Sequence, residues 1–362
     1  MGGSGIVRSG GGRRGVAGRR VAGRRGAAAL ALSALLLAGG GVVRAQDPEV
    51  PEGRLLVLNK HANTLMVFEV PSHRKLATVS VGEEPHEVVA TPDGRKAYVA
   101  NARGRSLSIV DLETYGKPRT LRSNNFDFPH GLAVTADGRR LVLTSEGSRR
   151  LFLIDAVRDT ILRSVTTTQR GAHMVALAPD GKRAFVPNIA SDSLTIVKLP
   201  EFRIARHLKV GNGPEGIAVT SNGRFVLTAL QETDQVAILD GSSLEVLAKL
   251  PTGRTPVRVA VAPGGFTALV ANRGSDDVTA LDVLSRRVKA TVRVGRKPGG
   301  IAFNATGTRA YVCNNDGDSV AVVSVPGFEL RETIPVGDHP DGIAFVKHRP
   351  PPKAKPEKRK RP

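Results

Sequence analysis

Three histidines and one glutamate recur at the same position of a repeated pattern. His86, His130, His173 and Glu215 follow one another at spacings of 44, 43 and 42 residues, and each opens a short, mainly apolar run. Imidazole and carboxylate groups are good ligands for zinc or copper, and an open coordination position would permit catalysis. Further along the chain the same position holds Val257, Gly299 and Asp341. The pattern therefore predicts a possible zinc or copper site formed by the first four residues.

Two other interpretations of these residues remain open. A polar position at the rim of a fold can hold histidine simply because its ring hydrogen-bonds the preceding loop, and duplication of a repeat copies such a residue. In a metal-free hydrolase of the lactonase type, Glu215 or a histidine would be the general base, and Arg258 would stabilise the developing oxyanion.

A second set of candidates consists of charged residues on loops expected at the same end of the strands. These residues could surround a small anionic ligand, and solvated loop charge is the alternative. The set comprises Arg103, Arg105, Glu146, Arg149, Asp234, Arg258 and Asp341. No phosphate-binding loop, nucleophile elbow, CxxC or HExxH motif occurs in the sequence.

The elements that must position these residues are short strands in a repeat of about 42 residues. Turn glycines mark the period at Gly94, Gly138, Gly181, Gly223, Gly265 and Gly307. Turns throughout, without helical periodicity, are typical of a β-propeller with four short strands in each unit. Stacking such units around an axis buries both faces of each sheet. The recurring glycine beside the apolar run, as at Gly131 and Gly342, predicts close approach of backbones.

The two ends of the repeat fix the number of units. The apolar run that starts the innermost strand occurs seven times, and its last copy lies at 341–345. Residues 54–81 contain only three strands, so they lack this one. We therefore expect an all-β, seven-bladed propeller over 54–347, in which the C-terminal strand completes the N-terminal blade and removes exposed sheet edges.

The repeat resembles a known family. The unit EPHEVVATPDGRKAYVAN at 84–101 and its copies are similar to the YVTN-type β-propeller repeat of exported prokaryotic proteins. The resemblance covers residues 54–347 and weakens at 138–158, where LVLTS replaces AYVAN. It implies a seven-bladed propeller but does not define a chemical activity.

Charge is concentrated at the two ends of the chain. Residues 1–45 hold eight arginines and no acid, and 347–362 carry a net +7, so only about +5 of the formal +20 belongs to the residues between them. The basic composition is therefore poor support for specific nucleic-acid binding by the folded part.

The N-terminus has the features of an export signal. Arginines precede a small-residue and apolar run, and Val43-Arg44-Ala45 fits a cleavage site. We expect a Sec or twin-arginine signal peptide at 1–45, a linker at 46–53, a basic disordered tail at 348–362 and a periplasmic or secreted location. The mature chain should have no transmembrane span. Cys313 is expected to be a buried core residue, without a disulfide.

Three classes of function follow. The first is a monomeric, non-catalytic exported propeller that binds a protein, an envelope polymer or a small ligand on its His-rich face. The second is a copper- or zinc-dependent oxidoreductase or hydrolase. The third is a metal-free, lactonase-like hydrolase. The sequence favours the first class.

Overall fold

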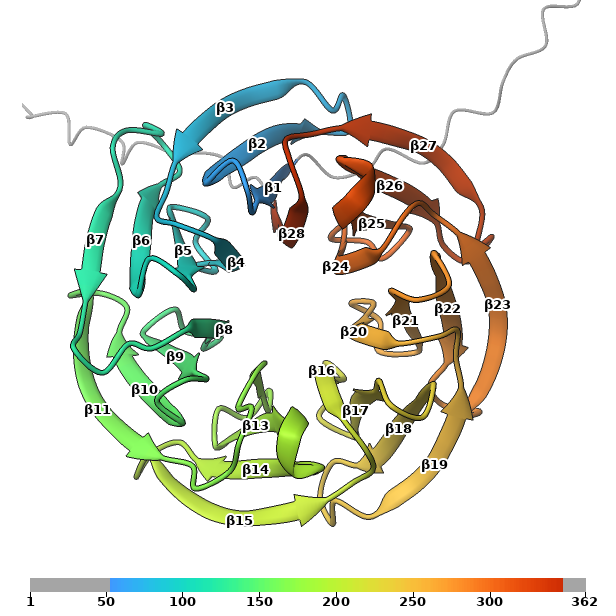
Figure 1. The fold of residues 1–362 in the computed structure, drawn as a ribbon. Helices are drawn as coiled ribbons and strands as arrows, with labels where there is room; N and C mark the ends of the chain where they lie inside the picture. The colour runs from blue at the N-terminus through green and yellow to red at the C-terminus, as the bar shows by residue number, and fades with distance from the viewer. Residues whose placement is uncertain (1–52, 348–362) are drawn as a thin grey trace, which may run out of the picture. The chain divides into compact units, whose positions relative to one another are not determined.

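Seven four-stranded antiparallel sheets are arranged around an axis in the computed structural model, which describes residues 53–347 (Figure 1). The sequence thus predicted the fold class and the blade number correctly. The signal peptide, nearly all of the linker and the basic tail expected from the sequence lie outside the described residues. In the described part of the chain, no helix is long and apolar enough to cross a membrane.

Each blade holds four strands, in order from the innermost to the outermost. The first blade holds β28 (Pro340–Lys347), β1 (Gly53–Asn59), β2 (Thr64–Val70) and β3 (Lys75–Ser80). The second holds β4 (Pro85–Ala90), β5 (Lys96–Asn101), β6 (Ser106–Asp111) and β7 (Arg119–Arg122). The third holds β8 (Pro129–Val134), β9 (Arg140–Ser145), β10 (Arg150–Asp155) and β11 (Thr160–Thr166). The fourth holds β12 (Ala176–Leu177), β13 (Arg183–Asn188), β14 (Ser193–Lys198) and β15 (Arg203–Lys209).

The remaining three blades follow the same order. The fifth holds β16 (Pro214–Val219), β17 (Phe225–Leu230), β18 (Gln235–Asp240) and β19 (Val246–Pro251). The sixth holds β20 (Pro256–Val261), β21 (Thr267–Asn272), β22 (Asp277–Asp282) and β23 (Arg287–Arg293). The seventh holds β24 (Pro298–Phe303), β25 (Arg309–Asn314), β26 (Ser319–Ser324) and β27 (Leu330–Pro335). Two short 3-10 turns, η1 (Ile189–Ser191) and η2 (Asn315–Gly317), follow β13 and β25.

The C-terminal strand closes the ring as the sequence predicted. β28 pairs antiparallel with β1 from Gly53↔Lys347 to Asn59↔Pro340. Ile343 and Val346 of this strand are nearly fully buried. The ring is therefore held shut by contacts between residues almost 300 positions apart in the chain.

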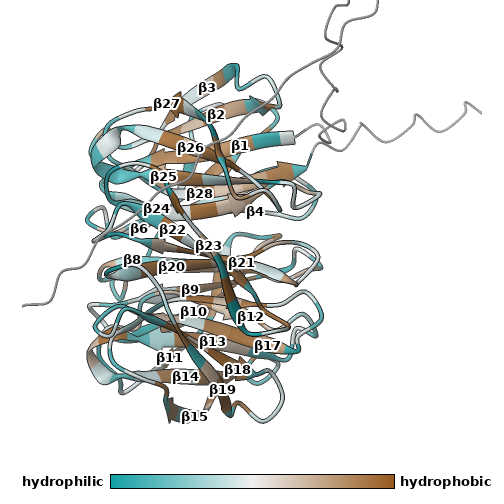
Figure 2. Cartoon of the chain, turned by 90° about the vertical axis from the view of Figure 1, so that its right-hand side faces the viewer, coloured by the Kyte–Doolittle hydropathy of each residue, from teal (hydrophilic) through white to brown (hydrophobic). Residues whose placement is uncertain are grey.

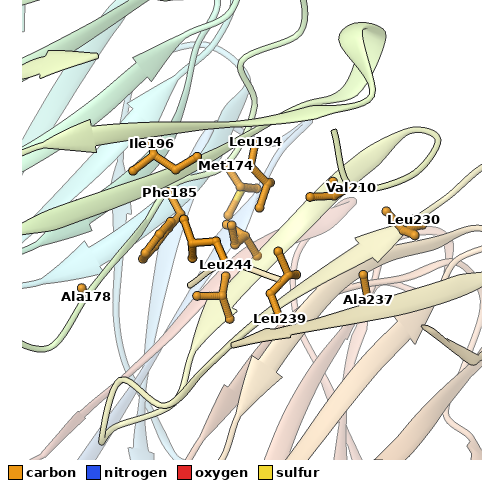
Figure 3. Close-up of a cluster of buried hydrophobic side chains, with 12 residues drawn as sticks. Met174, Ala178, Phe185, Leu194, Ile196, Val210, Leu230, Ala237, Leu239 and Leu244 are labelled. Carbon is orange, nitrogen blue, oxygen red and sulfur yellow. The ribbon is translucent and has the colours of Figure 1, made fainter. Parts of the chain in front are cut away.

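The core lies between the blades. Hydrophobic residues run along the strands, whereas the connecting loops at both ends are largely hydrophilic (Figure 2). Between the fourth and fifth blades, for example, Phe185 and Ile196 pack with Leu239 in one buried cluster (Figure 3). Cys313 is fully buried in a similar cluster, and this burial raises the pKa of its thiol well above the usual value. The thiol is therefore in its unreactive, protonated form, as expected.

One innermost strand departs from the prediction. The sequence predicts a full strand at 173–177, but β12 contains only Ala176 and Leu177. The neighbouring strand β13 carries Pro187, which has no backbone N–H to donate to the ladder. His173 is held instead by its own N–H, which donates to Pro187 O at 3.0 Å.

Candidate functional site

The backbone at the start of the innermost strands is shaped alike in all blades. In each blade, the residue two positions before His86 or its counterpart has a left-handed φ, between 49° and 71°. The seven residues are Glu84, Phe128, Gly171, Gly213, Thr255, Lys297 and His339. In five blades the N–H of this residue donates to an Asn or Asp side chain of the preceding blade's loop, as Thr255 does to Asp234 at 2.7 Å. Asp234 therefore fixes a loop.

A β-bulge then turns the recurring side chains. Six of the seven innermost strands show a register shift at this point, for example between Pro85 and Glu87. A bulge re-aims a side chain relative to the regular alternation of a strand. The fourth blade achieves a similar result with its broken strand at His173.

The three histidine rings lie close together as a tilted stack, with interplanar angles of 40° and 31°. The ring centroids of His86 and His130 lie 4.4 Å apart, and those of His130 and His173 lie 3.7 Å apart. His130 is the central ring and is only 1% exposed. The structure thus brings together the three histidines that the repeat places at equivalent positions.

Carboxylates hold the two outer rings of the stack. Nδ1 of His86 lies 2.9 Å from Asp341, and Nδ1 of His173 lies 2.9 Å from Glu146. Nε2 of His173 is also 3.6 Å from Glu215. We call these six residues, His86, His130, His173, Glu146, Glu215 and Asp341, the His–carboxylate cluster. The structure therefore brings together all four residues predicted as metal ligands and two of the residues predicted to bind a small ligand.

The protonation states within the cluster differ. Burial opposes a charge on His173, but hydrogen bonds to Glu146 and Glu215 outweigh it and raise the pKa of His173 to about 9. Burial, reinforced by the neighbouring rings of His173 and His86, holds the pKa of His130 well below its usual value. Burial also acts on Asp341, yet the hydrogen bond from His86 keeps its pKa well below normal. At neutral pH a cationic ring and a neutral ring therefore lie next to each other, tilted by 31°.

Two imidazole nitrogens in the cluster are unpaired. His86 Nε2 and His130 Nδ1 are buried and have no hydrogen-bond partner among residues 53–347. They lie near the surface, because the side chain of Glu146 is 31% exposed and that of Glu84, whose Oε1 lies 3.8 Å from His86 Nε2, is 21% exposed. The cluster therefore offers buried polar atoms close to solvent.

An ion pair crosses the axis next to the cluster. Arg258 of β20 pairs with Glu87 of β4, and both side chains are nearly buried, at 13% and 11% exposure. The guanidinium Nη1 also lies 2.6 Å from Met174 Sδ. The two residues are 171 positions apart, so no local pattern revealed the contact. Glycines occupy the equivalent position in four other blades. A Cβ at Gly131 would lie 2.5 Å from His173 O, which confirms the expected close approach of backbones.

The remaining predicted ligand residues lie apart from the cluster. Arg103 pairs with Glu84 at 2.9 Å and is mostly exposed. Arg105 donates to Phe126 O at 2.9 Å and lies 3.7 Å from Asp127. The structure thus shows both arginines bound to loop groups. Sequence reasoning missed Glu84 and Glu87, although both flank the Pro85-His86 pair.

The cluster does not present a ready metal site. Among residues 53–347, no group of three or more His, Cys, Asp or Glu side chains is arranged to hold a metal ion. The rings face one another, and the nitrogens of His173 are directed at carboxylates. Metal binding by His86, His130, His173 and Glu215 stays a prediction.

A separate pocket of about 880 Å³ lies between the third and fourth blades, at the opposite ends of their strands. Leucines line much of it, including Leu153, Leu162 and Leu177. Its arginines already have partners: Arg140 lies 3.3 Å from Asp155, and Arg163 donates to Glu201 O at 3.0 Å. The pocket therefore lacks the unpaired polar atoms that distinguish the His–carboxylate cluster.

Fold and cluster together define a seven-bladed β-propeller with a polar histidine stack near its axis. Residues 160–334 match the family model described as YNCE-like beta-propeller, in agreement with the resemblance of the repeat to the YVTN type. No match was found among curated proteins.

Solved structures share the fold at low sequence identity. One is a functionally unknown protein from Desulfotomaculum acetoxidans DSM 771, with 14% identity and a TM-score of 0.71 over 81% of this chain and 98% of that one. Another is the hydrazine synthase of Kuenenia stuttgartiensis, with 20% identity and a TM-score of 0.69 over 79% of this chain and 99% of that one. At such identities the likeness concerns the fold alone.

Proposed function

We propose that this chain is an exported binding protein that holds a ligand at its His–carboxylate cluster. The single observation that carries the proposal is the pair of buried nitrogens without a hydrogen bond, His86 Nε2 and His130 Nδ1. Buried polar atoms normally find a hydrogen-bond partner, so such a pair close to solvent suits a small ligand or an inserted side chain that supplies the missing groups.

A metal-free, lactonase-like reaction is less well supported. That mechanism requires Arg258 to stabilise a developing negative charge. In this structure the guanidinium already faces the carboxylate of Glu87, which neutralises it. The contact with Glu87 favours a structural role for Arg258 next to the cluster.

A bound zinc or copper ion is the second candidate. Histidines that ligate metals commonly donate their other ring N–H to a carboxylate, and Asp341 and Glu146 stand in that relation to His86 and His173. Binding would require His173 to lose a proton that its two carboxylates hold strongly. Only the metal-dependent oxidoreductase or hydrolase of the second function class depends on such an ion.

The binding proposal is tested by thermal shift with defined probes: zinc, copper, free amino acids, uronic acids and lactones. His130→Phe keeps a flat ring in the stack but removes both nitrogens. We expect a probe that stabilises the natural protein to lose its effect on this variant. His207→Phe, on the outer strand β15, is the matched control and should keep the effect. If His130→Phe responds like the natural protein, the cluster is not the binding site.

Export to the periplasm or the exterior is part of this proposal and rests on the N-terminal sequence. Intact-mass measurement of the protein recovered from its native cells should give a chain that begins at Gln46. A chain that retains residues 1–45 would contradict it.

A further inference from the structure

The outermost strands of the blades differ in their charge. β15, β19 and β23 belong to three consecutive blades (Figure 1). They carry seven Lys or Arg residues and no Asp or Glu: Arg203, Arg206, Lys209, Lys249, Arg287, Lys289 and Arg293. The other four outer strands, β3, β7, β11 and β27, carry five Lys or Arg residues in total, and β27 adds an acid. We call the seven residues the basic rim.

Most cations of the basic rim are unpaired. The side chains of five of them, namely Arg203, Lys249, Arg287, Lys289 and Arg293, are exposed and make no hydrogen bond or ion pair within residues 53–347. The remaining two bind backbone carbonyls: Lys209 donates to Ser191 O at 3.0 Å and lies 4.0 Å from Asp192, and Arg206 donates to Ser243 O at 3.1 Å.

Cations on the other outer strands are mostly neutralised or engaged. Arg119 of β7 pairs with Asp159, and Arg331 of β27 lies 3.3 Å from Glu329. Single charges on an edge strand protect it from pairing with another sheet. The other four strands achieve this protection with one or two cations each. Protection of the edge therefore does not explain the excess on β15 and β23, which carry three cations each, whereas β19 between them carries only Lys249.

We propose that the basic rim binds a linear acidic polysaccharide, a uronate or sulfated polymer that follows the curved edge of the fourth, fifth and sixth blades. Complementary charge along a surface raises the local concentration of a polyanion and its rate of association. This surface is distinct from the His–carboxylate cluster, and the inference does not depend on the function proposed there.

The shape of the rim selects among polyanions. Three consecutive blades of a closed ring turn their outer edges in different directions, so a flat anionic membrane would meet only one of them at a time. Duplex DNA is stiff over about 150 base pairs and cannot follow so tight a curve without a large bending cost. A flexible polymer can contact all three strands.

The composition of the rim disfavours single-stranded nucleic acids. Proteins that bind single strands stack the bases on aromatic side chains in addition to pairing with phosphates. The strands RIARHLK, VLAKLP and RVKATVR contain no Phe, Tyr or Trp. A polymer that carries its charge without bases fits this surface better.

The test compares two full-length variants that lose the same charge. The rim variant carries Arg203→Gln, Lys249→Gln, Lys289→Gln and Arg293→Gln. The control variant carries Lys75→Gln, Lys117→Gln, Arg139→Gln and Arg170→Gln, all exposed and outside β15, β19 and β23. Both keep the basic chain ends, so any difference between them reports the rim. Binding to polygalacturonate, dextran sulfate and a 20-nucleotide single-stranded DNA is measured between 50 and 200 mM salt.

We expect the rim variant to lose at least about tenfold in affinity for the two polysaccharides, and the control variant to stay within about twofold of the natural protein. The slope of log affinity against log salt should become shallower in the rim variant alone, since fewer counterions are released when contacts are lost. Equal losses in both variants, or no binding by the natural protein, would overturn the inference. Tighter, rim-dependent binding of the DNA would overturn the choice of polysaccharide.

Discussion

Removing only one partner of the ion pair between Arg258 and Glu87 should lower the free energy of unfolding by several kcal/mol. Both side chains are close to 90% buried, and they join blades on different sides of the axis. Arg258→Met deletes the positive charge but keeps much of the side-chain volume, which leaves Glu87 buried without its partner. Breaking a buried pair in this way typically costs about 3–5 kcal/mol.

The assay is thermal and urea denaturation of the single and double variants. In a domain of this size about 2 °C of melting temperature corresponds to 1 kcal/mol, so Arg258→Met should melt about 6–10 °C lower. Adding Glu87→Leu removes the stranded carboxylate and should restore most of the loss, because an apolar pair of similar volume is often as stable as an ion pair. The exposed pair of Arg103 and Glu84 is the control, and Arg103→Met should leave the melting temperature nearly unchanged.

The pH dependence of the Arg258→Met variant provides a further check. Burial raises the pKa of Glu87 even in the natural protein, and loss of Arg258 removes the main opposing influence. A carboxyl whose pKa is raised in the folded state favours folding when it is protonated. The stability deficit of the variant should therefore shrink as the pH falls from 7 towards the ordinary glutamate value of about 4.3. A deficit that is independent of pH, or a double variant no more stable than the single one, would refute the reasoning.

Three further predictions concern the cluster and the closure of the ring. Because the pKa of His173 is raised to about 9, its contribution to stability should be complete below about pH 6.5 and lost as the pH rises through 9. Urea denaturation should show this loss of stability, and the double variant Glu146→Gln with Glu215→Gln should no longer show it. If zinc or copper binds, adding either ion should raise the melting temperature, the gain should weaken as the pH falls below about 9 because His173 then becomes protonated, and Ala at His86, His130 and His173 should remove it; an unchanged gain in that triple variant would exclude the site. Deletion of 338–362 removes β28 and should lower the melting temperature of the whole propeller, whereas deletion of 349–362 should not; equal melting curves for both deletions would contradict closure by β28.

The repeat made most of the fold predictable. Period, turn glycines and the alternation of apolar residues are local properties, so they can be read directly from the chain. All six turn glycines adopt φ between 66° and 77°, as their turns require. The fourth strand of the first blade could likewise be identified by counting strands, because a closed ring leaves only one place for β28. Local chemistry also explains the one innermost strand that is shorter than predicted, since Pro187 lies in the strand next to residues 173–177.

The sequence also determined which residues share a level near the axis, because equivalent positions in a ring of repeats are related by rotation. It therefore placed His86, His130 and His173 together. It did not determine what each side chain contacts there. A β-bulge and the broken β12 set the direction of each histidine, and the resulting ring-on-ring stacking and carboxylate contacts decide the protonation states.

Contacts across the axis were decided by the tertiary structure alone. Arg258 reaches Glu87 from a blade on another side of the ring. Both replace the glycine of four other blades, but the sequence does not show that the two charges meet. The basic rim emerged for the same reason: its cations are scattered over 203–293 in the sequence, and only the order of the blades places them on one continuous edge. Rotation around the axis brings together residues whose separation along the chain carries no information about distance.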